Sequence, residues 1–376
     1  MALRFGVEEE YFVADPSSRK VVPRAPAVVE RASATLGERA STELIDFLGE
    51  AKTSPCHDSA KLAEQVAEMR SAMAAAAAAE GLRLVATGTP VLGELLPAPI
   101  GAGARYADSL ATYRALDDEQ CICSCHVHVE MPDTGRAVLV SNHLRPWLPV
   151  LLALSANSPY WAGRDTGHAC WRVMSWARWP VAGPPPFFRS PEHYEELVET
   201  LLGCGALMDT ATIFWDVRPS ARLPTLEVRL GDVAMTAAES VLFAVLTRAL
   251  VQVSLDAVEA GDPAPDPPPE LLRAAYWLAA RNGLAGNGVD LRTGRPVPFR
   301  ALAGDLLAHV RPALARTGDL GLVAAGMREL LERGTGAERQ RAAYRRRDLL
   351  TDVVDAAMIP VAGDRGPGEP RHPPAV

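Results

Sequence analysis

Acidic side chains recur at alternate positions in the N-terminal segment FGVEEEYFV, where Glu8 and Glu10 stand two residues apart. His126 opens the H-V-H-V run of CHVHVEM, and Glu227 stands two residues before Arg229 in PTLEVRL. Because side chains on a strand alternate between two faces, each of these pairs faces one side if its segment is a strand. Converging carboxylates are ligands of hard divalent cations such as Mg²⁺, which also bind phosphate oxygens. The residues alone therefore predict a metal site or a site for another charged ligand.

Two more glutamates bear on this site. Glu50, in LGEAKT, is a further candidate ligand. Glu9 faces the opposite side of its strand, together with Val7 and Tyr11, and we leave it out of the site. A buried carboxylate costs several kcal/mol unless a partner compensates it, so we expect a positive partner opposite these glutamates.

Cysteines precede the histidines, which raises zinc as an alternative ligand. Zinc motifs usually pair cysteines as C-x₂-C, so that a turn can wrap the ion. Here C-x-C-x-C followed directly by H-x-H sends sulfurs and imidazoles to opposite faces of a strand, which favours cysteines packed in the core. In a cytosolic chain of this size the cysteines need not be bridged. They are Cys56, Cys121, Cys123, Cys125, Cys170 and Cys204.

Motifs of several other reaction classes are absent from the sequence. It contains no G-x-x-x-x-G-K-[ST] loop, no G-x-G-x-x-G after a strand and no G-x-S-x-G elbow. A glycosidase-like carboxylate pair stays open on composition, although it would leave the histidines and arginines without a role.

The composition indicates a globular protein with an acidic balance. The 376 residues are 48% apolar and 22% charged, and the net charge is −8. This charge argues against a nucleic-acid or anionic-membrane partner, because such partners need a basic face. No run of about 18 uncharged apolar residues occurs, so we expect no membrane span. The segment MALRFGVEEE lacks the basic and apolar regions of a signal peptide, so we expect a cytoplasmic protein.

The elements that would position these residues are strands separated by long helices. We expect strands over 5–13, within 42–56, over 82–90 and 121–131, and side by side over 212–220 and 224–232. We expect helices over 58–81, near 106–116, over 136–159 with a proline break, over 194–208 and over 236–261. After a linker at 262–269, we expect the remainder of the chain to be helical.

The order of these elements contains no repeated βαβ unit. It therefore favours an α+β fold in which an antiparallel sheet is flanked by helices. One catalytic domain over residues 1–361 is the simplest organisation. Residues 362–376 are rich in proline and glycine, so we expect a disordered tail.

Seven segments together resemble the carboxylate–amine ligase family, in the glutamate–cysteine ligase type 2 group. They follow the family's order from Phe5 to Tyr344, and they are FGVEEEYFV, LGEAKTSPC, CHVHVEMPD, NHLRPWLPVLLALSANSPYWAGRDTG, RWPVAG, FWDVRPSARLPTLEVRLGD and ERQRAAY. The stretches SANSPYWAGRDTG and WDVRPS, the latter with PTLEVR, are the most specific of them.

This resemblance implies a fold similar to the catalytic core of glutamine synthetase. It implies ATP-dependent amide formation through an acyl phosphate, with ATP and two or three Mg²⁺ ions as cofactors and Mn²⁺ as a possible substitute. The implied substrates are the γ-carboxyl group of glutamate and an amine such as that of cysteine, and the implied assembly is a homodimer. The same chemistry on other substrates stays open, as does a catalytically weak nucleotide-binding protein.

The resemblance also implies roles for individual residues. The implied metal ligands are Glu8, Glu10, Glu50, His126 and Glu227. The implied catalytic residues, near phosphate or the substrate carboxylate, are Arg218 and Arg229. The implied nucleotide-binding residues are Lys52, Arg172 and Arg229. The segments expected to close over the sheet and shield the acyl phosphate from water are 100–106 and 162–190.

Three positions depart from the family pattern beside the inferred site. The family usually has G-T-H-P where this chain reads G-T-P at Gly88–Pro90. Glu130 stands where a glycine commonly follows the H-V-H-V run, and Lys52 replaces an aliphatic or small residue. These departures leave the inferred metal ligands intact and bear on the choice of substrate.

Overall fold

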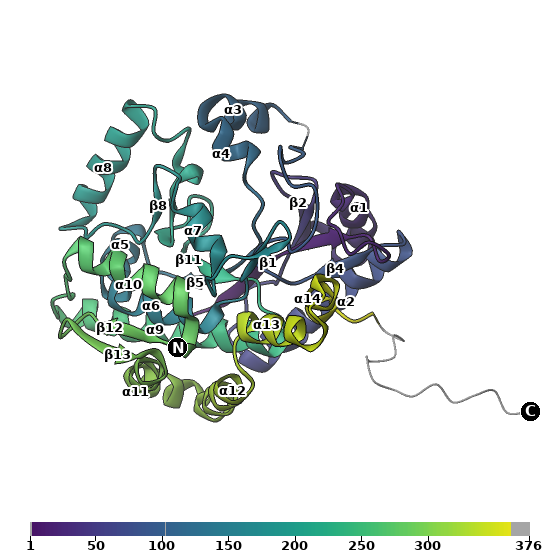
Figure 1. Ribbon diagram of the computed structural model, residues 1–376. Coiled ribbons are helices and arrows are strands. Elements are labelled where there is room, and N and C mark those ends of the chain that lie inside the picture. The colour runs from purple at the N-terminus through teal and green to yellow at the C-terminus, as the bar shows by residue number, and fades with distance from the viewer. Residues whose placement is uncertain (1, 102, 362–376) are drawn as a thin grey trace, which may run out of the picture.

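The computed structural model describes residues 2–101 and 103–361 and centres on one antiparallel sheet (Figure 1). Its seven strands are β1 (Phe5–Ala14), β2 (Ala40–Thr42), β3 (Leu48–Lys52), β4 (Arg83–Val85), β5 (Ser124–Glu130), β10 (Val217–Pro219) and β11 (Thr225–Asp232). The strand order is β10-β11-β5-β1-β3-β2, and β4 pairs with the last residues of β1. Three ribbons lie outside the sheet: β6 (Tyr160–Trp161) with β7 (Arg164–Asp165), β8 (Ala182–Gly183) with β9 (Phe214–Trp215), and β12 (Asn287–Asp290) with β13 (Arg295–Pro298).

Long helices cover one face of the sheet. The helices in contact with it or with each other there are α1 (Ala25–Leu36), α2 (Ser59–Ala79), α5 (Thr134–Leu144), α6 (Leu148–Ser155) and α9 (Ala237–Ala260). The remaining helices are α3 (Ala104–Tyr113), α4 (Ala115–Asp118), α7 (Trp171–Trp176), α8 (Pro191–Gly203), α10 (Pro269–Asn282), α11 (Phe299–Thr317), α12 (Leu320–Arg333), α13 (Gly336–Arg347) and α14 (Leu350–Ala357). In the view of Figure 1, α9, α11 and α12 lie below the sheet, whereas α3, α4 and α8 stand above it. The face of the sheet opposite α2 and α9 is called the open face below, because its side chains border two cavities.

Local sequence signals begin and end the two helices that pack against β1. The Asp58 carboxylate accepts hydrogen bonds from the first N–H groups of α2, which is the usual role of an N-cap. Thr236 and Glu239 form a capping box at the start of α9, and Gly261 ends that helix in the left-handed conformation, with φ of 76°. These caps fix the start of both helices and the end of α9.

The covered face of β1 contains one charged residue, Glu9, which is fully buried. Its carboxylate accepts hydrogen bonds from Arg70 of α2, from Ser240 of α9 and from the Tyr11 hydroxyl. Arg70 Nε lies 2.9 Å from Glu9 Oε2, and the same guanidinium donates to the carbonyl oxygen of Ala234. The structure thus places Glu9 in the core, on the side that strand alternation predicted.

The pairing register decides which side chains share the open face. β1 and β3 place Glu8 opposite Lys52 and Glu10 opposite Glu50. β1 and β5 place Glu8 opposite His126. Directly opposed residues of an antiparallel pair project to the same face of the sheet. These five side chains therefore stand together above the sheet.

The open face extends across β11 to β10. Glu227 of β11 is paired with His128 of β5 on one side and with Arg218 of β10 on the other. The β11–β5 register shifts between Val228 and Gly231, which marks a bulge in the ladder. Side chains from five strands are thereby brought to one face.

Most elements expected from the sequence are present. The α+β fold with an antiparallel sheet is confirmed, and the strand expected over 5–13 is β1. The helix expected over 136–159 divides into α5 and α6 at a 3₁₀ turn that contains Pro146. The expectation of an entirely helical C-terminal part was wrong, because the β12–β13 hairpin interrupts it. The tail predicted at 362–376 lies outside the described residues.

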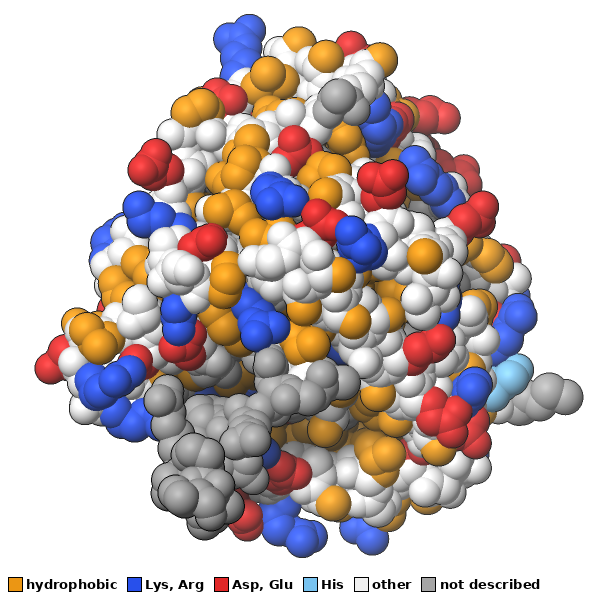
Figure 2. Space-filling view, turned by 90° about the vertical axis from the view of Figure 1, so that its right-hand side faces the viewer, with side chains coloured by type: hydrophobic (Ala, Val, Ile, Leu, Met, Phe, Trp, Pro, Cys, Tyr) orange, Lys and Arg blue, Asp and Glu red, His pale blue; other side chains and the backbone are white. Residues whose placement is uncertain are grey.

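Within residues 2–101 and 103–361, two helical segments are long and apolar enough to cross a membrane by composition, namely 134–155 and α9. The most apolar window of each is 78% and 72% buried inside the protein, as expected of core helices in a folded domain. On the face shown in Figure 2, acidic and basic side chains are interspersed around apolar ones. Packing within the protein therefore accounts for the apolar character of both segments.

Candidate active site

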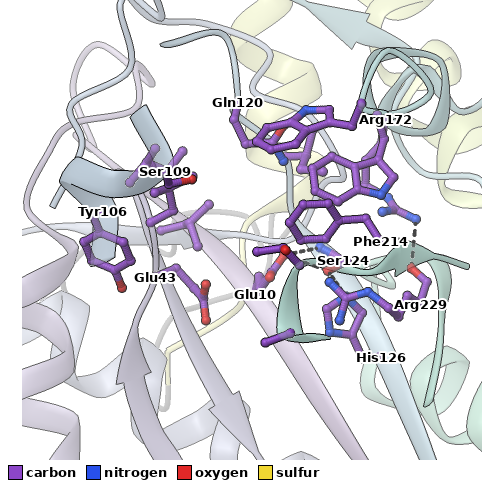
Figure 3. A pocket seen from close by; sticks show the side chains of 18 of the residues that line it. Glu10, Glu43, Tyr106, Ser109, Gln120, Ser124, His126, Arg172, Phe214 and Arg229 are labelled. Atoms are coloured by element: carbon purple, nitrogen blue, oxygen red, sulfur yellow. Dashed lines mark hydrogen bonds between the residues drawn. The ribbon is translucent and has the colours of Figure 1, made fainter. Parts of the chain in front are cut away.

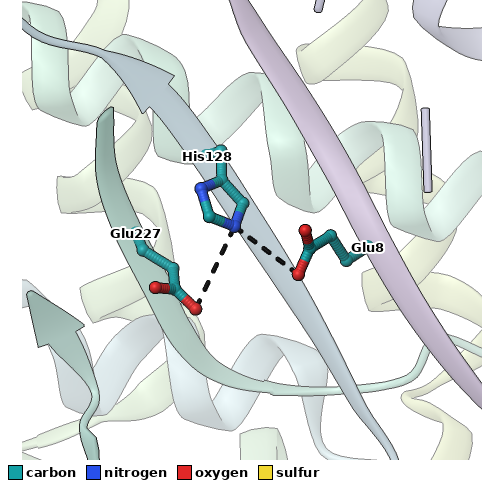
Figure 4. A group of neighbouring side chains, drawn as sticks. All are labelled: Glu8, His128 and Glu227. Carbon is teal, nitrogen blue, oxygen red and sulfur yellow. Dashed lines mark ion pairs between the residues drawn. The ribbon is translucent and has the colours of Figure 1, made fainter. Parts of the chain in front are cut away.

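Glu8, His128 and Glu227 form a compact group on the open face, called the His128 group below (Figure 4). His128 Nε2 is 3.6 Å from Glu8 Oε2 and 4.0 Å from Glu227 Oε1. Nδ1 of the same ring lies 2.9 Å from the Thr225 hydroxyl oxygen, which orients the imidazole. Nε2 is buried and has no hydrogen-bond partner among the described residues. The group thus offers one nitrogen and two carboxylates to a cation.

His126 lies beside this group. Its Nδ1 is 3.7 Å from Glu8 Oε2 and 3.9 Å from Glu227 Oε1, while its Nε2 is 2.7 Å from the Ser124 hydroxyl oxygen. Burial, reinforced by the charge of Arg229, lowers the pKa of His126 to about 4. The imidazole is therefore neutral at pH 7, the form in which it can bind a metal ion.

Two arginines hold Glu227. Arg218 Nε donates to Glu227 Oε2 at 2.8 Å, and Arg229 donates to Oε1. Burial opposes ionisation of Glu227, but the attraction of Arg229 and Arg218 keeps its pKa well below the usual range. Arg218 also donates to the carbonyl oxygens of Ala211 and Ile213. Arg229 Nε is buried without a partner among the described residues, so Arg229 keeps a donor for a bound anion.

Glu10, Glu43 and Glu50 form a second group, called the Glu43 group below. One carboxylate oxygen of each lies within 4.8 Å of the others. Two donors reach Glu50 Oε1: the Ser41 hydroxyl at 2.7 Å and Lys52 Nζ at 2.9 Å. Three carboxylates therefore converge where the structure records one ammonium contact.

The environment of the Glu43 group disfavours three negative charges. Burial, with added repulsion from Glu50 and Glu10, raises the pKa of Glu43 well above its usual value. Burial also raises the pKa of Glu10, although Ser124 donates to Glu10 from its N–H and its hydroxyl, both at 2.7 Å. A divalent cation would relieve this repulsion, so the carboxylate set fits Mg²⁺.

Two cavities adjoin these groups at different points along β1. The Glu10 cavity, of about 210 Å³, is bordered by Glu10, Glu43, Ser124 and Arg229 (Figure 3). The Lys52 cavity, of about 220 Å³, is bordered by Gly6, Glu8, Lys52 and His128. Glu10 of β1 therefore borders one cavity and Glu8 borders the other, and each cavity could hold part of a ligand.

Aromatic side chains form one wall of the Glu10 cavity. Trp176, Trp179 and Phe214 pack edge to face, with ring centroids 4.8 Å apart for Trp176 and Phe214 and 5.2 Å apart for Trp179 and Phe214. In Figure 3, Tyr106 and Glu43 stand across the cavity from Phe214. The cavity therefore joins a carboxylate group to an apolar, planar wall.

The structure brings most of the predicted site residues together. Those on the open face of the sheet are Glu8, Glu10, Glu50, Lys52, His126, Arg218, Glu227 and Arg229. Their roles as metal, nucleotide or catalytic residues stay predictions at this point.

Arg172 approaches the Glu10 cavity from α7 instead of from the sheet. Its Nε donates to Asp232 at 2.7 Å, and a second nitrogen donates to the carbonyl oxygens of Arg229 and Leu230. These contacts hold α7 against the bulge of β11. The predicted role of Arg172 in nucleotide binding stays a prediction.

Two side chains of the groups were not among the predicted ligands. His128 shares a strand face with His126, so the H-V-H-V spacing contained the signal that could have included it. Glu43 lies in the loop between β2 and β3, where no periodic pattern places a side chain. The sequence therefore indicated the strand residues better than the loop residue.

The cysteines of CICSCHVHV lie apart from both groups. Cys121, Cys123 and Cys125 are buried, and Cys125 is paired with Glu9, which faces the covering helices. Neither of the two groups found among the described residues contains a cysteine. The arrangement agrees with core cysteines, the alternative that the spacing favoured over zinc.

Asp216 lies behind the site, between β9 and β10, and is 2% exposed. Burial raises its pKa from 3.8 to about 6, against the attraction of Arg172. The folded state therefore binds more protons than the unfolded state between these values, and the protein loses stability as the pH rises through them. We expect Asp216→Asn to be more stable than the wild type at pH 7 by roughly 1–3 kcal/mol. Urea denaturation at pH 7 and near pH 4 should show this gain disappear at the lower pH.

The exposed Asp108 of α3 provides a control, because its side chain faces solvent and Asp108→Asn should change the stability at pH 7 by no more than about 0.5 kcal/mol. An equal gain for Asp216→Asn at both pH values would contradict the raised pKa.

Sequence comparison shows which proteins the chain is similar to. Residues 4–356 match the family described as Glutamate-cysteine ligase family 2 (GCS2). The chain is 45% identical over 361 residues to "Putative glutamate–cysteine ligase 2-2" of Mycolicibacterium vanbaalenii, across 96% of this chain and 98% of the relative. It is 42% identical over 370 residues to "Putative glutamate–cysteine ligase 2-1" of Saccharopolyspora erythraea, across 98% and 97%.

Structure comparison shows the same architecture in two solved proteins. The glutamate–cysteine ligase of Francisella tularensis in complex with AMP superposes with a TM-score of 0.70 at 12% identity, across 95% of this chain and 88% of that one. A bifunctional glutathione synthetase from Pasteurella multocida gives a TM-score of 0.70 at 13% identity, across 95% of this chain and 52% of that one. At 12% and 13% sequence identity, the similarity to these two structures shows a shared fold only.

Proposed function

Because the chain belongs to glutamate–cysteine ligase family 2, we propose that this ligase joins the γ-carboxyl group of glutamate to the amine of cysteine or a related amine, using ATP and Mg²⁺. The terminal phosphoryl group of ATP is transferred to the substrate carboxylate, which gives an acyl phosphate and ADP. The amine then attacks the acyl carbon, and phosphate leaves. The amide, ADP and phosphate are the products.

The convergence of the His128 group and the Glu43 group on one sheet face supports this proposal most strongly. Phosphoryl transfer to a carboxylate brings two anions together, so the site needs positive charge between them. The carboxylates of the two groups would hold Mg²⁺, which would supply positive charge against the phosphate. The unpartnered His128 Nε2 and the crowded carboxylates around Glu43 are atoms that such ions would satisfy.

We assign the protein groups as follows. The metal ligands are Glu8, His128 and Glu227 in one group and Glu10, Glu43 and Glu50 in the other, with His126 beside the first. The guanidinium of Arg229 borders the Glu10 cavity, carries a donor without a partner among the described residues, and binds phosphate or the substrate carboxylate. Arg218 fixes the orientation of Glu227 through its two hydrogen bonds.

The two cavities favour separate places for the substrates. The nucleotide phosphates lie toward the Lys52 cavity, where an ammonium borders the His128 group. The acid and the amine lie in the Glu10 cavity, next to the Glu43 group. Residues of 100–106 and 162–190 border that cavity, among them Arg105, Tyr106, Arg172 and Trp176. These segments are placed to keep water from the acyl phosphate.

The first test is ADP release with Mg²⁺ and ATP across a panel of amino acids, alone and in pairs with amines, with products identified by mass. Release that needs both glutamate and cysteine, with a product of the mass of their amide, is the expected result. ATP binding without amine-dependent ADP release would refute the ligase proposal and favour a nucleotide-binding protein of weak activity.

The aromatic wall favours a second candidate, in which the same chemistry uses a bulkier apolar amine or acid. An aromatic or branched substrate would pack against Trp176 and Phe214 where they line the cavity, whereas a small polar amino acid would leave this contact unmade. In the same panel, a kcat/KM higher for phenylalanine-like amines than for cysteine would select this candidate.

The proposal includes a cytoplasmic homodimer that acts on small molecules, without a nucleic-acid partner or a membrane. The net charge of −8 supports the absence of a nucleic-acid or anionic-membrane partner. Light scattering of the purified protein would decide between a dimer and a monomer.

A further inference from the structure

Lys52 stands between the two carboxylate groups. It is one of three lysines in the chain, with Lys20 and Lys61. In the β1–β3 register it lies directly opposite Glu8, and on its own strand it lies two residues after Glu50, on the same face. Its side chain is 35% exposed and borders the Lys52 cavity, so its ammonium reaches both the sheet and the space above it.

The ammonium of Lys52 contacts one carboxylate oxygen of the Glu43 group. Nζ lies 2.9 Å from Glu50 Oε1, the oxygen that also accepts the Ser41 hydroxyl. Of the ion pairs recorded between described residues, this is the one that reaches the Glu43 group. A metal ion bound through this oxygen would compete with Lys52 for it, and an ion bound through the other oxygen of Glu50 would repel the ammonium.

The two groups differ in how their charge is balanced. In the His128 group, two guanidinium groups, those of Arg218 and Arg229, already neutralise Glu227. In the Glu43 group, one ammonium faces three carboxylates. The affinity of the Glu43 group for a divalent ion should therefore depend on Lys52 more than on any arginine of the site.

We propose that Lys52 exchanges partners: it holds Glu50 while the Glu43 group is free of metal, and it binds the terminal phosphate group of the nucleotide once an ion takes Glu50. The inference rests on the proposed function, because it needs a nucleotide in the Lys52 cavity. The flexible four-carbon side chain of Lys52 allows its ammonium to move between Glu50 and a phosphate in the Lys52 cavity. An ammonium is a compact charge, so neither contact requires a fixed geometry. Removing the ammonium should then strengthen metal binding and weaken nucleotide binding, two effects of opposite sign.

The variant Lys52→Met tests this exchange, because it keeps the length of the side chain and removes its charge. Electron paramagnetic resonance of free Mn²⁺, without nucleotide, should show the Mn²⁺ Kd of the variant fall by about tenfold. Calorimetry with a non-hydrolysable ATP analogue at saturating Mn²⁺ should show the analogue Kd rise by about tenfold. Lys52→Arg, which keeps the charge, should stay near the wild type for Mn²⁺.

Lys61→Met is the matched control. Lys61 is exposed on α2 and pairs with Glu64 at 2.9 Å, away from both groups. Its replacement should change neither Kd. If Lys52→Met does not fold, as judged by circular dichroism, Lys52→Gln replaces it in both measurements.

The outcomes separate this inference from the proposed function. An unchanged Mn²⁺ Kd in Lys52→Met would overturn the exchange, and so would a loss of both affinities, which a purely structural lysine would cause. If the wild-type protein bound neither Mn²⁺ nor the analogue, the proposed function itself would fail. If the wild type bound both and the variant matched it, the role of Lys52 alone would fail.

Discussion

Glu8→Gln is expected to lower kcat for amine-dependent ADP release by about 10²–10³-fold while leaving the fold intact. Glu8 occupies the centre of the site, since its carboxylate faces both His126 and His128. Burial alone would raise the pKa of Glu8, but these two contacts hold it well below its usual value, so it is ionised at neutral pH. The amide of glutamine is nearly the same shape but uncharged, and it is a poorer ligand for Mg²⁺.

The measurement is steady-state ADP release at saturating substrates, together with a thermal unfolding curve for each variant. Glu329→Gln is the control, because Glu329 is exposed on α12, paired with Arg333 at 2.6 Å, and lies outside both groups and both cavities. It should change kcat by no more than about twofold. Near wild-type turnover in Glu8→Gln would remove Glu8 from the metal site, and equal losses in both variants would indicate a disturbance unrelated to metal binding.

Arg70→Met is expected to lower the free energy of unfolding by about 3–5 kcal/mol. Arg70 is 5% exposed and Glu9 is fully buried, so the substitution leaves an uncompensated carboxylate between the sheet and its covering helices. Ser240 and Tyr11 still donate to that carboxylate, but neither carries a charge. Urea denaturation, analysed with a common m value, would measure the loss.

Glu68→Gln on the same helix is the control, because Glu68 forms an exposed pair with Arg39 at 3.0 Å and should cost about 0–1 kcal/mol. The double variant Glu9→Leu with Arg70→Met should regain part of the loss, since it leaves no unpaired charge. A loss below 1 kcal/mol in Arg70→Met alone would mean that the pair contributes no more than a surface contact.

Strand alternation made the open face predictable from the sequence. The spacing of Glu8 and Glu10 put them on one side of β1, and the same rule excluded Glu9, as the structure shows. Which strands lie side by side could not be obtained from spacing, because cross-strand pairing is decided by contacts between distant segments. The pairing of Glu227 with His128 is of this kind.

The position of Glu43 and the β12–β13 hairpin could not be predicted from the sequence for a different reason. Glu43 is placed by a loop between two short strands, and its position follows from the fold instead of from any local period. The β12–β13 hairpin contains glycine and prolines, residues that strand propensities disfavour. Its turn is held by Asp290, whose carboxylate accepts the N–H of Arg292 at 3.0 Å.

The three consecutive glutamates of β1 make the position of this strand ambiguous until its partners are in place. A slip by one residue would turn Glu9 upward, send Glu8 and Glu10 into the core and bring the buried Val7 and Tyr11 out of it. Arg70 lies on the core side and donates to the Glu9 carboxylate, so a slipped strand would leave two carboxylates facing this one guanidinium. The buried pair therefore selects a single alignment of β1 during folding, and with it decides which two carboxylates are delivered to the site.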